Sequence, residues 1–528
     1  MTAAGGSRRS LREAGWQCDA PGRYVELREA ARALEPGTTR VPSAEPGVDQ
    51  FRWNLVTMRE ARNEKLASLR DPTDDQRRAW VAYMRARGVP GDLTIRAPGA
   101  RDHTSFLFLG DPGEGDSSQY AVVAPLKSRA DGIDFAFVAS DVVYPAGDVN
   151  DYRRKFYLPY GDLPFPLYAI PGNHDWDDGG LFGFMFHFCG VDEPPRSVLG
   201  AVPPVLRPLW RKPAPIDDAS SAARRSREEA GLVPGQPGSY FALDTGPLLL
   251  LGLDLGLCGR VDRDQGRWLA DRSRSDPRPK ILVTSKPVFG DGRYTPTPIE
   301  GGGTIDEVVR DPASNYVAVV SGEIHNYQRY AVAVPGARTI QYVVCGAAGA
   351  FTQGTHTIGP ISIANPDPGL SPVDEADVRL YPLRADSLSF FSELYARRAE
   401  RSRPFRLLLR AAGIRRPADL RIRPERAGAL IEELGHAPAA REAASPPDET
   451  DRRAARVIRW LPDGHLGELY YPYWDWDEPP FFKCFLRVDA TADEVRIRCF
   501  AATGCAEHDA DPPLEDEFTW RREGGWAA

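Results

Sequence analysis

Side chains that can bind metals or move protons stand in five short blocks along the chain. Each block directly follows an apolar run and ends in polar residues. Oxygen and nitrogen donors of these types suit a hard or borderline metal ion. A His among them can also transfer a proton to or from a substrate. The blocks are Gly110-Asp111-Pro112-Gly113, Ser140-Asp141-Val142-Val143-Tyr144, Gly172-Asn173-His174-Asp175, Val283-Thr284-Ser285-Lys286 and Gly322-Glu323-Ile324-His325.

The elements that must position these blocks are predicted from the apolar runs before them. Runs that are apolar throughout indicate strands of a sheet covered on both faces. Helix-like stretches such as 264–273 lie between the runs, so the sequence predicts an α/β layered core. In such a core, ligand chemistry is expected just beyond the carboxyl ends of the strands. The predicted strands are 105–109, 135–138, 167–170, 248–253, 281–283, 316–320 and 340–344.

Changes in residue composition and in the spacing of apolar residues divide the chain into regions. Segment 51–88 has helical spacing that is broken at Asp71-Pro72, and 192–238 is rich in Pro, Arg and Ser. After residue 366 we expect helices at 387–399, 404–412 and 424–434, and then a hairpin of 481–488 with 494–501. The predicted division is a helical N-terminal region (1–100), a core (101–365) with an irregular insertion (192–238), a loop and helical insertion (366–456) and a C-terminal β region (457–528).

Composition sets the class of protein. The 528 residues carry a formal charge of −8, and 42% of them are hydrophobic. No apolar run approaches the ~20 residues of a membrane span, and no secretory signal is predicted. The seven Cys lie far apart, which favours a reducing cytoplasm over a disulfide scaffold. The acidic balance argues against bulk nucleic-acid binding. Richness in Arg, Ala, Pro and Gly favours a bacterial source, and the oligomeric state is not predicted.

The five blocks, in this order, resemble those of the calcineurin-like metallophosphoesterases, and within them the purple-acid-phosphatase type. The blocks of that type read GDxG, GDxxY, GNH[DE], VxxH and GHxH, and the resemblance covers about residues 104–365. Three blocks match, with Ser140 in place of a Gly. The other two are altered, because Lys286 and Glu323 stand where the family has His. The resemblance implies a four-layer α/β/β/α sandwich core, to which the helical N-terminal region, the helical insertion and the small C-terminal β region are added.

The resemblance also implies roles for individual residues. In that family the first metal position is held by residue types that are all present here, namely Asp111, Asp141, Tyr144 and His325. A tyrosinate at this position marks ferric iron. The second position is held by Asp141, Asn173 and two His, and both of these His are missing. His174 matches the family residue that orients the phosphate and helps to protonate the leaving group.

Three interpretations of the second position stay open. In the first interpretation, Lys286 and Glu323 form an ion pair in the place of the second metal, and Lys286 acts as a point charge beside a phosphoryl oxygen. Alternatively, Glu323, Asn173 and Asp141 hold a second ion such as Mn, Zn or Mg. In the third interpretation the site is degenerate and inactive. The chain has only eight His, and outside the blocks His356 and His187 are the two considered as replacement ligands.

The function implied is a metal-dependent phosphoesterase, a hydrolase of a small phosphorylated substrate that works by attack of metal-bound hydroxide. His174, Lys286 and Asn173 are the expected catalytic residues, stabilising the charge that develops on phosphoryl oxygens. The alternatives are a non-catalytic scaffold or binding protein of the same fold, and a mononuclear iron site with other chemistry. Taken alone, Asp111 also fits a helix N-cap, and Tyr144 a buried core residue.

Three further features attract functional interpretations. The basic run 397–426 could bind a phosphorylated polymer, nucleic acid or a membrane surface. Alternatively, it is the solvated face of helices whose apolar stripe is Phe405, Leu408 and Leu409. The aromatic run 470–476 suits a stacking platform or a domain interface. Gly301-Gly302-Gly303 is not a phosphate loop, because no GK[ST] follows it.

Overall fold

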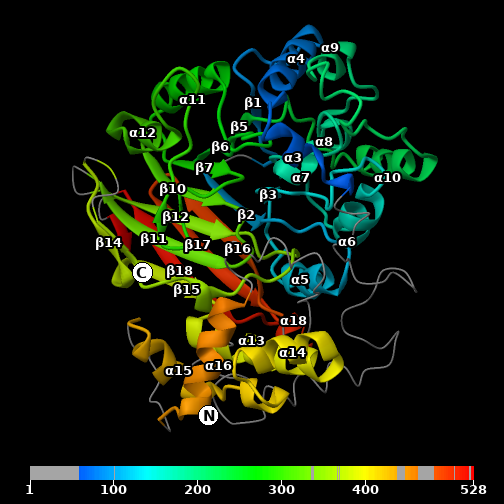
Figure 1. Ribbon diagram of the computed structural model, residues 1–528. Coiled ribbons are helices and arrows are strands. Elements are labelled where there is room, and N and C mark those ends of the chain that lie inside the picture. The colour runs from blue at the N-terminus through cyan, green and yellow to red at the C-terminus, as the bar shows by residue number, and fades with distance from the viewer. Residues whose placement is uncertain are drawn as a thin grey trace.

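The apolar runs form the strands of two large sheets in the protein, for which we describe a computed structural model (Figure 1). The central strands are buried along their whole length, as expected for strands covered on both faces. The structure describes residues 59–99, 102–334, 338–364, 367, 369–436, 446–461, 481–504, 506–522 and 525–527.

The larger sheet has eight strands, four of which run parallel side by side. In spatial order the strands are β1 (Thr94–Arg96), β5 (Phe241–Asp244), β6 (Leu249–Gly252), β7 (Lys280–Thr284), β10 (Tyr316–Ser321), β12 (Arg338–Cys345), β11 (Tyr327–Val334) and β15 (Val378–Tyr381). Strands β6, β7, β10 and β12 are the parallel set, so their carboxyl ends share one edge. The predicted helical N-terminal region also contains β1, which pairs parallel with β5.

The second sheet has seven strands and joins the two ends of the chain. In spatial order they are β19 (Gly525–Ala527), β18 (Leu514–Arg521), β17 (Glu494–Ala502), β16 (Lys483–Thr491), β2 (His103–Leu109), β3 (Phe135–Val138) and β4 (Leu167–Ala169). Strands β2, β3 and β4 are parallel, while β16 pairs antiparallel with β2. The strands of the C-terminal β region are therefore part of the same sheet as the first core strands.

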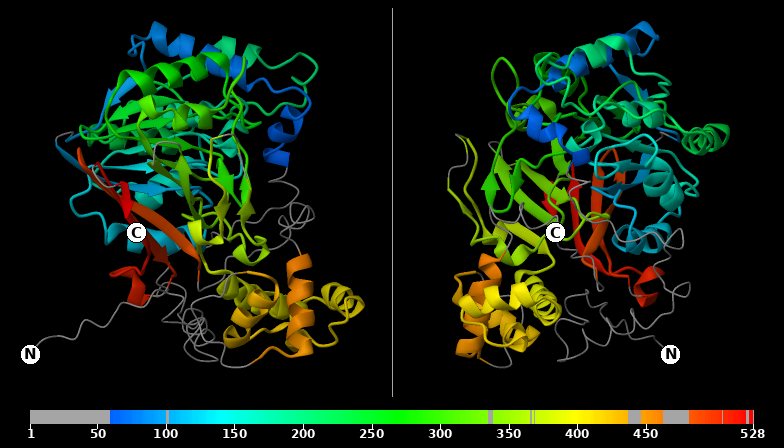
Figure 2. Two further views of the ribbon diagram at one scale, coloured as in Figure 1. Left: turned by 90° about the vertical axis from the view of Figure 1, so that its left-hand side faces the viewer. Right: turned by 45° about the vertical axis from the view of Figure 1, so that its right-hand side comes forward.

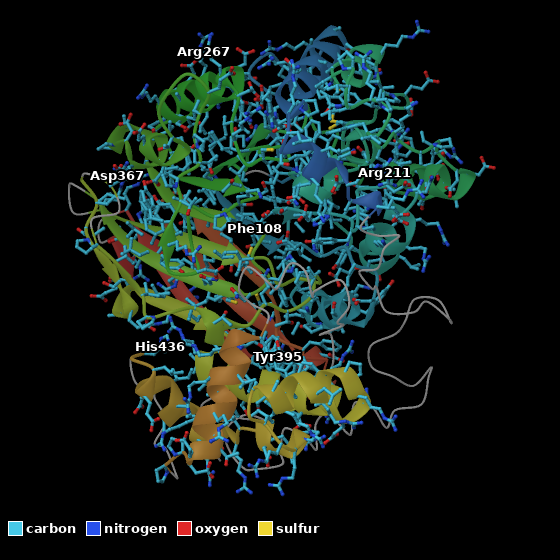
Figure 3. The ribbon with its side chains drawn as sticks, in the orientation of Figure 1. Phe108, Arg211, Arg267, Asp367, Tyr395 and His436 are labelled. Atoms are coloured by element: carbon cyan, nitrogen blue, oxygen red, sulfur yellow. The ribbon has the colours of Figure 1, made fainter. Side chains whose placement is uncertain are left out.

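The two sheets pack face to face over an aromatic core. Phe106 stacks on Phe135 within the smaller sheet, with ring centroids 4.7 Å apart. Phe137 stacks on Phe241 of the larger sheet at 5.9 Å, and Phe108 lies in the same cluster (Figure 3). Ring pairs at these distances add to the hydrophobic gain from burial. This cluster fixes how the carboxyl ends of the two parallel sets face each other.

Helices cover the outer face of each sheet, which confirms the predicted α/β/β/α arrangement. Helices α5 (Ser117–Lys127) and α8 (Phe182–Cys189) pack on the smaller sheet. Helices α11 (Arg263–Ser275) and α12 (Ile305–Arg310) pack on the larger one. Two short hairpins are β8 (Phe289–Gly290) with β9 (Arg293–Tyr294), and β13 (Ser362–Ile363) with β14 (Val373–Asp374).

The N-terminal helices pack on the core through one buried arginine. Helices α3 (Asn63–Ala67) and α4 (Thr73–Ala86) are separated at the predicted break at Asp71-Pro72. Arg77 of α4 is buried and pairs with Asp254 (Nε to Oδ2, 3.1 Å) and Asp262 (Nη1 to Oδ2, 2.7 Å). Asp254 also accepts a 2.9 Å bond from the indole of Trp176. The helical layer is therefore tied to the residues just after the third block.

The insertion 192–238, predicted to be irregular, contains helices α9 (Arg196–Gly200) and α10 (Asp218–Glu229). Helix α10 begins where the Asp217 side chain accepts a bond from the Ser220 amide, a cap that Asp supplies well. Its Ala, Arg and Glu residues favour a helix. The Pro residues lie outside this helix, so the composition of the whole insertion did not indicate it.

Helices α13 (Arg384–Arg401), α14 (Arg403–Ala411), α15 (Pro424–Glu433) and α16 (Glu449–Trp460) form a subdomain at one end of the sheets (Figure 2). The predicted apolar stripe is wrong at one position. Phe405 and Leu409 are buried, but Leu408 is 44% exposed, because it lies about 100° around the helix from Leu409 and so at the edge of the buried face. The aromatic run 470–476, with Cys18, His465 and Cys505, lies outside the described residues. Among those described, no helix has both the length and the apolarity that a bilayer crossing requires.

Candidate metal centre

The carboxyl ends of the parallel strands bring the five sequence blocks together. Asp111 follows β2, Asp141 follows β3, and Asn173 begins the short helix α7 (Asn173–Trp176) after β4. From the facing sheet, Lys286 follows β7 and Glu323 follows β10. Because the two sheets pack face to face, the loops beyond their strands meet at one edge of the sandwich.

Several of these residues have strained backbones. The φ angle is 53° at Asp111, 35° at Asp141 and 69° at Glu323, and it is 153° at Ser140. Residues other than glycine rarely adopt such angles, at a cost of order 1–3 kcal/mol each. Strain of this kind persists where the surrounding structure holds it, and it concentrates at functional sites. Here it turns the side chains after β2, β3 and β10 toward one another.

Glycines allow the backbone to approach the carboxylates closely. A Cβ on Gly172 would lie 2.0 Å from Asp141 Oδ1. A Cβ on Gly322 or on Gly346 would lie 2.5 Å from Asp111 Oδ2. These distances are shorter than any real contact, so only glycine fits at these three positions.

Asp141, Tyr144 and His325 form a connected cluster. The Tyr144 hydroxyl lies 3.2 Å from Asp141 Oδ2 and 3.2 Å from His325 Nε2. Two ligands at about 2.1 Å from one ion are about 3.0 Å apart in an octahedron and about 3.4 Å apart in a tetrahedron. The observed spacing lies between these values. The Tyr144 hydroxyl is therefore spaced from Asp141 and from His325 as two ligands of one ion would be.

His325 is oriented in the way that metal-binding histidines are. Its Nδ1–H donates to the Phe351 carbonyl at 3.0 Å, which leaves Nε2 facing Tyr144. A backbone acceptor on one ring nitrogen fixes the tautomer and directs the lone pair of the other. Burial lowers the pKa of His325 to about 3, so the ring is neutral and its lone pair is available.

Some side-chain oxygens at the strand ends are buried without a hydrogen-bond partner among the described residues. They include Asp111 Oδ1, Asn173 Oδ1 and Glu323 Oε2. The other Asp111 oxygen accepts a 2.8 Å bond from the Glu323 amide. A buried acceptor left unsatisfied costs about 1–3 kcal/mol, and a cation would satisfy it. Within the described residues, no three His, Cys, Asp or Glu side chains converge in a ready ligand geometry. The donor set therefore depends on the phenol of Tyr144 and the amide of Asn173.

The charges of the cluster also favour a bound cation. Burial raises the pKa of Asp111, and the nearby carboxylates of Asp141 and Glu323 raise it further. Burial also raises the pKa of Asp141 to about 6, although His174 acts against the shift. Burial and the same carboxylates raise the pKa of Tyr144 well above its usual value. A bound cation would reverse these shifts, because it stabilises the deprotonated form of each ligand. The residues of the first position thus fit a metal ion.

The predicted contact between Lys286 and Glu323 is present. Lys286 Nζ lies 2.6 Å from Glu323 Oε1, and both side chains are partly buried. Burial by itself would lower the pKa of Lys286, but Glu323 outweighs it and raises the pKa, so the amine stays protonated. A protonated amine has no lone pair for a metal. Lys286 is thus held as a cation against the carboxylate of Glu323.

His174 is held beside Tyr144, with ring centroids 4.6 Å apart. Its Nδ1–H donates to the Pro145 carbonyl at 2.8 Å, and its amide donates to Asp141 Oδ1 at 2.9 Å. Burial alone would lower the pKa of His174, but Asp141, Glu64 and Asp177 together raise it above its usual value. The ring is therefore fixed in place and disposed to carry a proton.

Two residues that support the site were not singled out from the sequence. Asp175 accepts bonds from the amides of Gly172 (2.9 Å) and Val142 (3.0 Å), and so joins the second and third blocks. Its place in the third block was a signal that could have found it. Gln353 accepts a 3.0 Å bond from the His325 amide. No local pattern marks Gln353, because its partner lies on another element.

The two histidines considered as replacement ligands lie elsewhere. His187 of α8 is buried between the Tyr157 hydroxyl (2.9 Å) and the Val149 carbonyl (2.8 Å). His356 contacts the Ser387 hydroxyl at 2.8 Å and packs on Phe391, both of α13. These contacts engage both ring nitrogens of His187 and bury His356 against the helical subdomain. Neither residue replaces the His that is absent at positions 286 and 323.

Gly301-Gly302-Gly303 lines a surface pocket of about 480 Å³ between α11 and α12. Arg263 and Arg267 also line it, and Arg267 lies at the outer surface of α11 (Figure 3). No residue of the five blocks lines this pocket.

Comparisons with known proteins find only distant likenesses. No protein-family model matches the sequence, and no curated protein matches it. One similar solved structure is the purple acid phosphatase PPD1 from yellow lupin (Lupinus luteus) seeds, with 10% identity, a TM-score of 0.37, and coverage of 80% of this chain and 54% of that one. A structure of PhoD has 10% identity, a TM-score of 0.35, and coverage of 82% and 72%. The protein TT1561 of Thermus thermophilus has 13% identity, a TM-score of 0.27, and coverage of 51% and 98%. The chain spans about half the length of the lupin phosphatase chain, and at these TM-scores none of the likenesses assigns it to a family.

Proposed function

We propose that this protein is a metal-dependent phosphoesterase with one tightly bound metal. The ligands would be Asp111, Asp141, Tyr144 and His325. The observation that carries the proposal is the Tyr144 hydroxyl, which lies 3.2 Å from both Asp141 Oδ2 and His325 Nε2. Asp111 Oδ1, which follows β2 at the same edge, is buried without a hydrogen-bond partner among the described residues. A phenol ligand favours ferric iron, as the resemblance to purple acid phosphatases implies.

A metal held there would lower the pKa of a bound water and draw electron density from the phosphoryl group. The side chains of the protein do the rest. His174, fixed through Pro145 and with a raised pKa, would donate a proton to the leaving-group oxygen. Asn173 would donate from its amide nitrogen to a phosphoryl oxygen. Lys286 would supply the positive charge that a second metal supplies in two-metal sites.

The test is hydrolysis of a generic phosphomonoester and a generic phosphodiester by purified protein with Fe, Mn or Zn. We expect turnover that is lost in Asp141→Asn and in His325→Ala. His103→Ala is the matched control, because His103 is an exposed residue at the start of β2 and should leave turnover unchanged. Absence of turnover with every metal, in a folded protein, would contradict the proposal.

Three alternatives compete with this proposal. Glu323 Oε2 and Asn173 Oδ1 are both unpartnered among the described residues, so a second ion of Mn, Zn or Mg at Asp141, Asn173 and Glu323 is a competing arrangement. The altered second position also suits a non-catalytic scaffold, or a mononuclear iron site with other chemistry. Two ions per chain would favour the first alternative. A folded, metal-free and inactive protein would favour the scaffold.

The proposal includes a small phosphorylated substrate and a reducing, cytoplasmic environment. The five described cysteines that are free thiols, three of them buried near one another in the sheets, support the second point. Fractionation of the source cells, followed by detection of the protein, tests it directly.

A further inference from the structure

Helix α14 presents an apolar surface to solvent. Leu407 is 65% exposed and Leu408 is 44% exposed, whereas Phe405 and Leu409 are buried. Phe405 packs toward Tyr395 of α13, with ring centroids 6.1 Å apart, and Tyr395 lies where α13 meets α14 (Figure 3). The inner side of the helix therefore already has its partner, and the outer side centres on Leu407.

The same surface is basic and has no acidic residue of its own. Arg403 and Arg410 lie four residues before and three after Leu407, so they flank it on the outer side of the helix. Arg415 follows in the next loop and is also exposed. In the described part of the chain, none of these three arginines has an acidic partner within ion-pair distance. Some other arginines of the subdomain do have acidic partners, such as Arg452 with Glu433 and Arg456 with Glu449.

We propose that the α14 face, made of Arg403, Leu407, Leu408, Arg410 and Arg415, docks on the surface of an anionic lipid bilayer. Phospholipid headgroups supply phosphate and carboxylate oxygens to the arginines, and the two leucines enter the interface between headgroups and acyl chains. The chain as a whole carries a charge of −8, so attraction to an anionic surface must come from a local patch such as this one.

The combination of side chains favours a bilayer over a nucleic acid. A nucleic-acid backbone attracts the arginines but gives the exposed leucines no apolar partner. A bilayer uses both, and membrane binding by one short segment usually needs two such signals. The proposal is independent of the metal centre, because no residue of the α14 face belongs to the five blocks.

The experiment is co-sedimentation of the full chain with vesicles of phosphatidylcholine mixed with phosphatidylserine, and with vesicles of phosphatidylcholine alone. We expect binding to the mixed vesicles only, weakened by added salt because surface charges are screened. Arg403→Gln and Arg410→Gln should each weaken binding about fivefold, since one arginine near such a surface contributes about 1 kcal/mol. Leu407→Gln should weaken it about tenfold.

Matched controls remove the same kinds of side chain elsewhere. Leu209→Gln removes a leucine that is 59% exposed, and Arg452→Gln removes a paired arginine of α16. Both should bind vesicles as the unchanged protein does. Equal binding to both kinds of vesicle, no binding to either, or equal losses in the controls would overturn the proposal. So would tight binding of a single-stranded RNA that depends on Arg403 and Arg410 while the vesicles are ignored.

Discussion

Removal of Lys286 should open the second metal position. In the unchanged protein, a cation that binds Glu323 must first displace the Lys286 amine, which lies 2.6 Å from Glu323 Oε1. Lys286→Met keeps the length of the side chain but removes its charge. It leaves both Glu323 oxygens, Asn173 Oδ1 and Asp141 available to a second ion. We therefore expect Lys286→Met to bind one more divalent ion than the unchanged protein.

The size of the effect follows from the ion pair. At an effective dielectric constant of about 20, two unit charges 2.6 Å apart attract by about 6 kcal/mol before other terms. The side chains are 27% and 30% exposed, and desolvation and lost side-chain entropy cancel most of this attraction. About 1–3 kcal/mol remains for a pair of this kind. Since about 1.4 kcal/mol is tenfold in an equilibrium constant, the second Mn²⁺ should bind about 5- to 150-fold more tightly in Lys286→Met.

The assay is calorimetric titration of Mn²⁺ into protein that already holds its first metal, with the bound metal then counted by elemental analysis. Lys127→Met is the control, because Lys127 forms a 2.7 Å pair with Asp162 at the surface, away from the strand ends. If Lys286→Met and the control take up Mn²⁺ alike, Lys286 does not occupy a metal's place and this reasoning is refuted.

Three further predictions concern stability and metal binding. Arg77→Ala leaves Asp254 and its neighbours as uncompensated buried charges and should lower the free energy of unfolding by about 3–5 kcal/mol. The control Arg78→Ala, at an exposed pair, should change it by less than about 1 kcal/mol. Similar losses for both variants in urea unfolding would contradict the assigned role of Arg77. Burial lowers the pKa of His187 to about 3, below the ordinary value of about 6.5, so the unfolded chain binds more protons between these values. The free energy of unfolding should therefore fall as pH falls through this window, by about 2 kcal/mol at pH 5 from this residue alone. Urea unfolding at pH 7 and pH 5 should show a smaller fall in this free energy for His187→Gln than for the unchanged protein. Equal falls would contradict a buried neutral His187. Gly172→Ala would place a Cβ 2.0 Å from Asp141 Oδ1 and should lower metal affinity at least tenfold, a prediction that fails if calorimetric titration of Fe or Mn shows unchanged affinity.

The core strands were predictable because their signal is local. The run at 135–138 is apolar throughout and β3 has these same bounds, since a strand covered on both faces needs no polar side. The residues after the strands were predictable for the same reason. The contact of Lys286 with Glu323 was expected because the resemblance places both residues at the second metal position, and the pairing of β7 with β10 brings them side by side. That these residues replace a metal remains a proposal.

The remaining features depend on contacts between distant parts of the chain. Strand β16 pairs with β2 across more than 370 residues, and the sequence of neither strand indicates which strand it pairs with. Gln353 and the Phe351 carbonyl hold His325, but only the folded loop after β12 brings them there. Exposure of Leu408 follows from the exact rotation of α14 on α13, which residue type alone does not determine.

Metal content of the protein as isolated tests the central claim most directly. Elemental analysis against protein concentration, with a visible spectrum of the same sample, gives both the number and the kind of ion. One iron per chain is predicted, with a tyrosinate-to-iron absorption band that disappears in Tyr144→Phe. Two tightly bound ions per chain would contradict the claim that Lys286 and Glu323 occupy the second position. A folded protein that binds no metal at any concentration tested would contradict the metal centre itself.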